Sequence, residues 1–153
     1  MMREYTIFWV IDEIANHYFH KSDYLYRFFK DFQNDQERND LRIQYDYMTI
    51  EFPKELLVSH IENAYKGKSI LQIKGPQVEI YKNKQYIALH ISEKHLKFRC
   101  ETLQDAEELL FPVLRQFQLS LFIIGDNTHN YGWISPILAT SKYQSEQVLY
   151  SYL

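Results

Sequence analysis

The sequence has little of several residues on which common protein classes depend. Its 153 residues include one cysteine, Cys100, and only four glycines and four prolines. A single cysteine cannot form a disulfide within the chain, which is typical of proteins from a reducing compartment. Four scattered glycines cannot build a glycine-rich phosphate loop. So few Gly and Pro residues also argue against long structureless linkers.

Signals for export and for membrane insertion are also missing. The N-terminal stretch carries acidic side chains at Glu4, Asp12 and Glu13 and has no small-residue cleavage site, unlike a secretory signal peptide. No apolar run approaches the length needed to span a bilayer. We therefore expect a cytoplasmic protein without a membrane partner.

The sequence also lacks a stripe of basic residues. The formal net charge is −3, and the lysines and arginines are scattered among acidic residues as on a solvated surface. Proteins that bind nucleic acids normally concentrate positive charge on one face. The charge pattern therefore predicts no direct contact with DNA or RNA.

Aromatic side chains are what the sequence has in abundance. Aromatic residues make up 16% of the chain, with 13 Tyr and 10 Phe, and hydrophobic residues make up 46%. This length and composition predict a single domain over residues 1–153 with one substantial core. We expect the tail after about residue 137 to be poorly ordered or to form a frayed helix.

The spacing of apolar residues predicts a mixed order of strands and helices. Pro112 predicts a kink or an early end in the last of the helices, which begins at a cap formed by Thr102. This order predicts an α+β fold, with a single mostly antiparallel sheet and helices packed against it. The predicted strands are 4–11, 42–52, 69–75, 77–92 with a turn at 82–84, 95–101, 119–126 and 131–135, and the predicted helices are 12–19, 22–32, 54–67 and 103–117.

Two histidines three residues apart, His17 and His20, raise the question of a metal site. On a helix they lie on one side, and Asp23 continues that face. The familiar zinc motif with glutamate between two histidines is absent. The simpler interpretation is one buried, hydrogen-bonded histidine and one exposed histidine. We therefore expect no metal and no cofactor.

Cys100 is the candidate nucleophile, with any of the six histidines as its base. It falls within a strand pattern, away from the turns and helix N-termini where thiolates are activated. A buried packing role is the simpler interpretation, and we expect no enzymatic activity. A small metal- or Cys-dependent enzyme stays as the alternative.

The short helix predicted over residues 12–19 carries more apolar residues than one face can bury. If Phe19 turns inward, then Ile14, Ala15 and Tyr18 lie on a neighbouring outward strip, because residues 14 and 18 are four apart and stack. An apolar strip on a short helix is a common way for one helix to dock against another in trans.

Several segments resemble the sporulation inhibitor of replication family, SirA. Their order and spacing agree along nearly the whole chain, and the agreement is weaker over residues 54–100. The matching segments are EIANHYF (13–19) after an aromatic-rich first strand, IQY (43–45), VL (113–114), Asp126-Asn127 and YGWISP (131–136).

The resemblance implies a regulatory protein that binds the N-terminal domain of the replication initiator DnaA and inhibits initiation of chromosome replication during sporulation. It implies a monomer that forms a heterodimer with DnaA through an apolar, helix-against-helix contact. A binding module for another partner is the remaining alternative. The residues that the resemblance assigns to the partner contact are Ile14, Ala15 and Tyr18, with Arg42, Tyr45 and Pro136 as secondary candidates.

Overall fold

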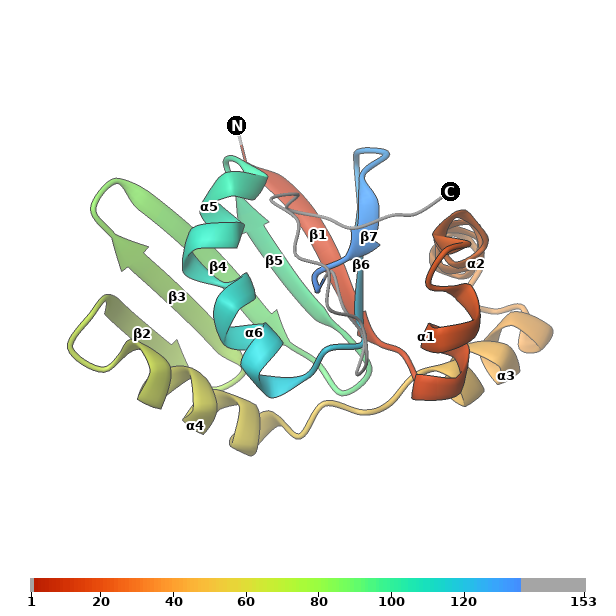
Figure 1. Ribbon diagram of the computed structural model, residues 1–153, viewed down its shortest axis with the longest axis horizontal. Helices are drawn as coiled ribbons and strands as arrows, with labels where there is room; N and C mark the ends of the chain where they lie inside the picture. The colour runs from red at the N-terminus through yellow and green to blue at the C-terminus, as the bar shows by residue number, and fades with distance from the viewer. Residues whose placement is uncertain (1, 136–153) are drawn as a thin grey trace.

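In residues 2–135, which the computed structural model describes, seven strands form one antiparallel sheet in the order β2-β3-β4-β5-β1-β6-β7 (Figure 1). The predicted α+β fold, with one antiparallel sheet and helices packed against it, is confirmed. No helix in this part of the chain is long and apolar enough to cross a membrane. The elements are, in chain order, β1 (Arg3–Trp9), α1 (Asp12–Tyr18), α2 (Ser22–Asn34), α3 (Asn39–Met48), α4 (Lys54–Tyr65), β2 (Ile70–Lys74), β3 (Gln77–Lys82), β4 (Gln85–Ile91), β5 (Leu96–Cys100), α5 (Leu103–Leu109), α6 (Phe111–Phe117), β6 (Leu121–Gly125) and β7 (Tyr131–Trp133).

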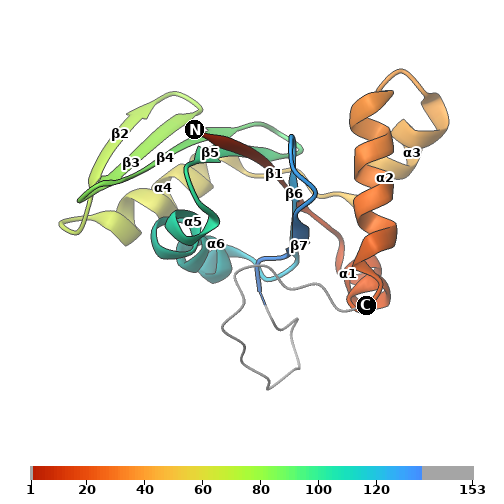
Figure 2. The ribbon, with the colours of Figure 1, turned by 90° about the horizontal axis from the view of Figure 1, so that it is seen from above.

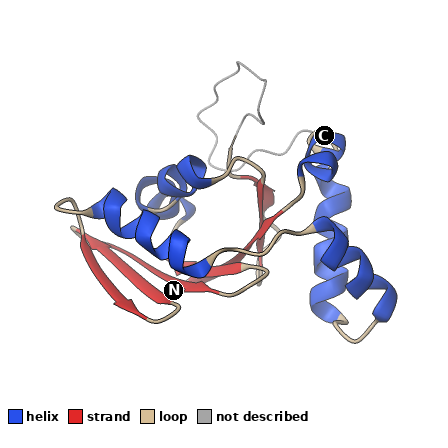
Figure 3. Ribbon diagram, turned by 90° about the horizontal axis from the view of Figure 1, so that it is seen from below, coloured by secondary structure: helices blue, strands red, loops and turns tan. Residues whose placement is uncertain are grey.

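The sheet separates two hydrophobic cores. Helices α4, α5 and α6 cover one face, and their apolar residues meet Tyr5 and Ile7 of β1 in the first core. Helices α1, α2 and α3, here called the helical lobe, lie on the other face and bury Phe8 in the second core. The second core takes strand residues from β1, β6 and β7 only. The lobe therefore covers one end of the sheet, and the views from above and below show the two helix groups apart (Figures 2 and 3).

Several local predictions are confirmed and have clear physical causes. The Thr102 hydroxyl accepts a hydrogen bond from the Asp105 amide at 3.2 Å and caps α5. Pro112 stands in the first turn of α6, so the predicted helix over 103–117 is split into two. Asn83, with φ of 57°, makes the left-handed turn between β3 and β4.

The strand predicted over residues 42–52 is wrong, because most of this segment is the helix α3. The buried side chains of α3 are Tyr45 and Met48, and Leu41 packs partly against the second core, a spacing of four and three that fits a helix. Ile43 and Tyr47, which alternation placed beside Tyr45, are exposed instead. Only the end of the segment is strand-like, where Thr49 forms an isolated bridge with Val10.

Replacing Phe29 with alanine is expected to lower the free energy of unfolding by about 3–5 kcal/mol, the usual cost of deleting a buried phenylalanine. The Phe29 ring is fully buried and stacks on Phe8 with the ring centroids 4.0 Å apart. Urea denaturation followed by fluorescence measures the change. Phe28→Ala is the matched control, because Phe28 is only partly buried, and it is expected to cost less. Equal losses from the two variants would contradict this view of the second core.

Cys100 is expected to stay unreactive towards Ellman's reagent at pH 8 in the folded protein and to react once guanidinium unfolds it. It is fully buried in the first core, and burial raises the pKa of its thiol from 9.0 to about 12. Because the thiol ionises less readily in the folded chain, the protein should lose stability as pH rises from 9.0 towards 12. Rapid labelling of the native protein would show that the thiol is accessible.

Candidate functional site

The helical lobe is fixed to the sheet by aromatic stacking and by hydrogen bonds from a lysine side chain. Phe29 of α2 lies between Phe8 and Phe122, with ring centroids 4.0 and 5.9 Å away. Next to Phe29, the Lys30 ammonium donates hydrogen bonds to the carbonyl oxygens of Gly125 and Asp126, at the end of β6, at 2.6 and 3.1 Å. Apolar packing and charged hydrogen bonds together hold α2 in one position over β6.

Helix α1 is held on the second core by a few apolar side chains in the helix and directly after it. Ala15 and Phe19, four residues apart, are both buried, and the Phe19 ring lies 5.8 Å from that of Trp133 in β7. The inward position of Phe19 is thus confirmed. The outward position expected for Ala15 is wrong: its small side chain lets α1 approach the core closely, and only 1% of it is exposed.

An apolar surface remains on the outside of the lobe. Ile14 and Tyr18 lie one helical turn apart on α1, where each packs partly against the second core and leaves part of its side chain exposed. Three further large side chains stand exposed on the other helices of the lobe: Tyr24 of α2 at 57%, Ile43 of α3 at 62% and Tyr47 of α3 at 56%. We call these five residues the lobe surface.

Contacts between neighbours connect the lobe surface across the three helices. The Tyr18 ring lies 6.2 Å from the ring of Tyr24, which joins α1 to α2. The Tyr47 hydroxyl donates a hydrogen bond of 3.4 Å to Glu13, the residue before Ile14, which joins α3 to α1. Ile43 lies one turn before Tyr47 on α3. Exposed apolar side chains that adjoin in this way mark a contact surface more than single ones do.

Tyr24, Ile43 and Tyr47 were not predicted as site residues. The signal for two of them was present, because residues 43 and 47 are four apart and share a face of a helix. The strand interpretation of residues 42–52 concealed that face. Tyr24 gives no such signal, since its position beside Tyr18 depends on how α1 and α2 pack.

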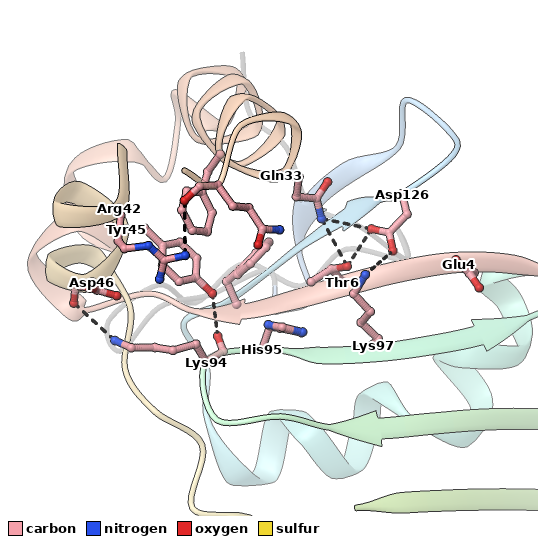
Figure 4. A pocket seen from close by; sticks show the side chains of 13 residues that line it. Glu4, Thr6, Gln33, Arg42, Tyr45, Asp46, Lys94, His95, Lys97 and Asp126 are labelled. Atoms are coloured by element: carbon pink, nitrogen blue, oxygen red, sulfur yellow. Dashed lines mark hydrogen bonds and ion pairs between the residues drawn. The ribbon is translucent and has the colours of Figure 1, made fainter. Parts of the chain in front are cut away.

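Arg42 and Tyr45 do not belong to the lobe surface but line a cleft between the lobe and the sheet (Figure 4). The cleft has a volume of about 470 Å³. Arg42 is exposed, with its guanidinium 5.6 Å from the centre of the Phe32 ring. Tyr45 is buried, stacks on Phe32 at 4.1 Å and donates a hydrogen bond from its hydroxyl to the Lys94 carbonyl at 3.3 Å. Tyr45 therefore positions α3.

Charged groups of the cleft form hydrogen bonds with neighbouring neutral groups. Lys94 donates from its ammonium to the Thr49 carbonyl at 3.0 Å, and Asp126 accepts a hydrogen bond of 2.7 Å from Thr6. Burial lowers the pKa of His95, and the positive charge of Lys97 adds to this effect. Burial also raises the pKa of the Tyr45 hydroxyl, so both rings are neutral at neutral pH.

The two histidines that suggested a metal site belong to the aromatic packing around α1. The His17 ring lies edge-on to Tyr18 at 4.6 Å, and the His20 ring lies edge-on to Phe19 at 5.3 Å. Both side chains are exposed, so the expectation that one is buried is wrong. Among residues 2–135, no three His, Cys, Asp or Glu side chains gather as a metal ion would require.

Cys100 and Pro136 are the two remaining residues that the sequence singled out. Cys100 lies in the first core, on the face of the sheet away from the lobe, with the raised thiol pKa described above. A protonated, inaccessible thiol is a packing residue. Pro136, the last of the secondary candidates, lies outside the described residues.

Comparison with known proteins agrees with the resemblance found in the sequence. Residues 3–138 match the family described as "Sporulation inhibitor of replication protein SirA". A protein of that name from Bacillus subtilis (strain 168) is 22% identical over 146 residues, which cover 90% of this chain and 96% of that protein. This match spans both cores, the helical lobe and the cleft. The chain belongs to the SirA family of sporulation inhibitors of replication.

Proposed function

We propose that this protein binds the N-terminal domain of the replication initiator DnaA through the lobe surface and so inhibits initiation of chromosome replication during sporulation. The observation that carries the proposal is the exposed apolar surface on α1 and its neighbours, in the helix that bears the family signature EIANHYF. Membership of the SirA family supports a role in restraining replication.

The shape of the lobe surface supports a helix as the binding element of the partner. Ile14 and Tyr18 form one short stripe along α1, with Tyr24 next to Tyr18 and Tyr47 bonded to Glu13, the residue before Ile14. An apolar stripe with aromatic side chains beside it accepts the apolar face of a second helix. Tyrosines suit this purpose, because they bury a large area with few rotatable bonds.

Tyr18 is the best candidate for a central anchor. Its ring contacts His17 at 4.6 Å and Tyr24 at 6.2 Å, so its position is largely set before a partner arrives. Anchors that are ordered in advance lose less conformational entropy on binding. Ile14 extends the stripe by one turn, and Arg42 is a secondary contact at the mouth of the cleft. Ala15 and Tyr45 act from within, by holding α1 and α3 in place.

Inhibition by this route requires occupancy and no chemical step. A small protein that covers one face of the initiator's N-terminal domain excludes loading factors or self-assembly partners that need the same face. A regulator of this kind works with a modest interface in which a few anchors supply most of the affinity. The buried, protonated Cys100 and the hydrogen-bonded Lys94 and Asp126 of the cleft fit a binding protein better than an enzyme.

Tyr18→Ala is expected to weaken binding to the DnaA N-terminal domain by about 2 kcal/mol or more, as for a central aromatic anchor. Isothermal titration calorimetry measures the change, and circular dichroism checks that the variant is folded. Tyr81→Ala is the matched control, because Tyr81 lies on β3, away from the lobe, and its affinity should equal that of the native protein. A folded Tyr18→Ala protein with native affinity would rule out this face. A native protein that does not bind at all would rule out DnaA as the partner.

Ile43→Asp is expected to weaken the same complex by about tenfold, because a carboxylate would have to lose water at an apolar contact. Ile43 is 62% exposed, so the substitution should leave the fold intact. Leu56→Asp is a close control, since Leu56 of α4 is 63% exposed but lies outside the lobe. Biolayer interferometry with immobilised DnaA domain compares the two. Equal effects, or a loss confined to Leu56→Asp, would place the interface elsewhere.

A further inference from the structure

The strand β2 is an open edge of the sheet. It stands first in the strand order, and among residues 2–135 it pairs with β3 alone. The outer side of such a strand presents unpaired backbone N–H and C=O groups, which form a template for another strand. In Figure 2, β2 lies at the end of the molecule away from the helical lobe.

The sequence of β2, ILQIK, has little of the usual protection of an edge strand. Edge strands are commonly protected by proline, a bulge or charged side chains, especially lysine. The only charge in β2 is Lys74, its last residue, and its centre is the neutral Gln72. Ile70 is 67% exposed, the largest value for a big apolar side chain in the described part of the chain.

A hollow of about 590 Å³ lies beside this edge, between β2 and the end of α4. Leu71 and Ile73 line it from the strand, and Tyr65 lines it from the helix. Leu71 and Ile73 are only partly buried and face the first core. A strand added to the edge would place alternate side chains beside them, because successive side chains point to opposite faces.

We propose that β2 pairs with β2 of a second copy of this chain, in antiparallel register about Gln72, so that two sheets join edge to edge. In this register Gln72 faces its own equivalent, Leu71 faces Ile73 of the other copy, and Ile70 faces Lys74 of the other copy. Apolar residues meet apolar residues on the core side. No like charges stand opposite one another in this register. Like charges that faced each other would destabilise the strand pair.

A second copy suits this edge because the strand is complementary to itself. The twofold axis that runs through the Gln72 pair makes both halves of the contact identical and closes the assembly at two copies. Each copy adds its Leu71 and Ile73 to the apolar row beside the other copy's hollow. The aliphatic part of Lys74 covers Ile70 on the outer face while its ammonium stays in water.

The dimer leaves both lobe surfaces free, because the lobes stand at the two ends farthest from the joined edges (Figure 2). One dimer therefore presents two binding surfaces and can hold two partner molecules, or two sites of one assembly, with an avidity that a monomer lacks. The pairing of β2 does not depend on the proposed function, since it needs no partner. It differs from the monomer that the family resemblance implies.

The test uses a pair of opposite charges at the symmetry axis, Gln72→Glu and Gln72→Lys. Analytical ultracentrifugation of the full chain over a range of concentrations is expected to show a monomer–dimer equilibrium for the native protein. Each variant alone should dimerise roughly fivefold more weakly, because like charges then face each other. An equimolar mixture of the two variants should regain dimer, because opposite charges face each other in the mixed pair.

Gln116→Glu and Gln116→Lys are the matched controls, since Gln116 is exposed on α6 and should leave the equilibrium unchanged. Recovery in the mixture distinguishes a charge effect at the axis from unfolding of the single variants. A native protein that stays monomeric at every concentration would overturn the proposal. A dimer whose stability is unaffected by Gln72→Glu, by Gln72→Lys and by their mixture would place the contact on another surface and overturn it equally.

Discussion

Strand β1 carries apolar side chains on both of its faces, and the rest of the structure depends on this. Tyr5 and Ile7 point into the first core, while Phe8 points into the second and stacks on Phe29. An interior strand with helices on both sides can be apolar throughout, whereas a half-exposed strand must alternate with polar residues. Burying one phenylalanine stabilises the folded chain by about 1.5–3 kcal/mol. A polar residue at position 8 would leave the helical lobe without its main attachment.

The uneven cover of the sheet divides the molecule into regions with different properties. The first core runs beneath nearly the whole sheet, and the second lies under β1, β6 and β7 alone. Where the second core ends, the cleft with Arg42 and His95 begins. Beyond it, the outer faces of β2 to β5 carry mostly polar side chains, with aromatic pairs such as Tyr81 and Tyr86 bonded to Glu79. Exposed apolar side chains adjoin one another on the lobe, where a partner contact is expected, whereas Leu56 and Ile70 stand exposed on separate elements elsewhere.

Local signals in the sequence predicted the first core well and the lobe less well. Regular alternation identified β3, β4 and β5, and Thr102 and Pro112 set the start and the break of α5 and α6 by backbone chemistry alone. The segment around Tyr45 satisfied both a period of two and a helical period, and packing against Phe32 and Phe8 decided between them. The side of α1 that faces the core could not be predicted from its own seven residues. A small apolar residue such as Ala15 fits either side.

The contact between Phe19 and Trp133 joins the two ends of the described chain, since one belongs to the segment EIANHYF and the other to YGWISP. Ala15 is the one buried residue of α1, and Phe19, directly after the helix, is buried as well, so the contact of Phe19 with Trp133 helps to hold α1 on the second core. A ribosome making this protein releases α1 more than a hundred residues before Trp133. The lobe surface is therefore complete only after Trp133 has emerged, and a nascent chain that ends before this residue would not yet present it.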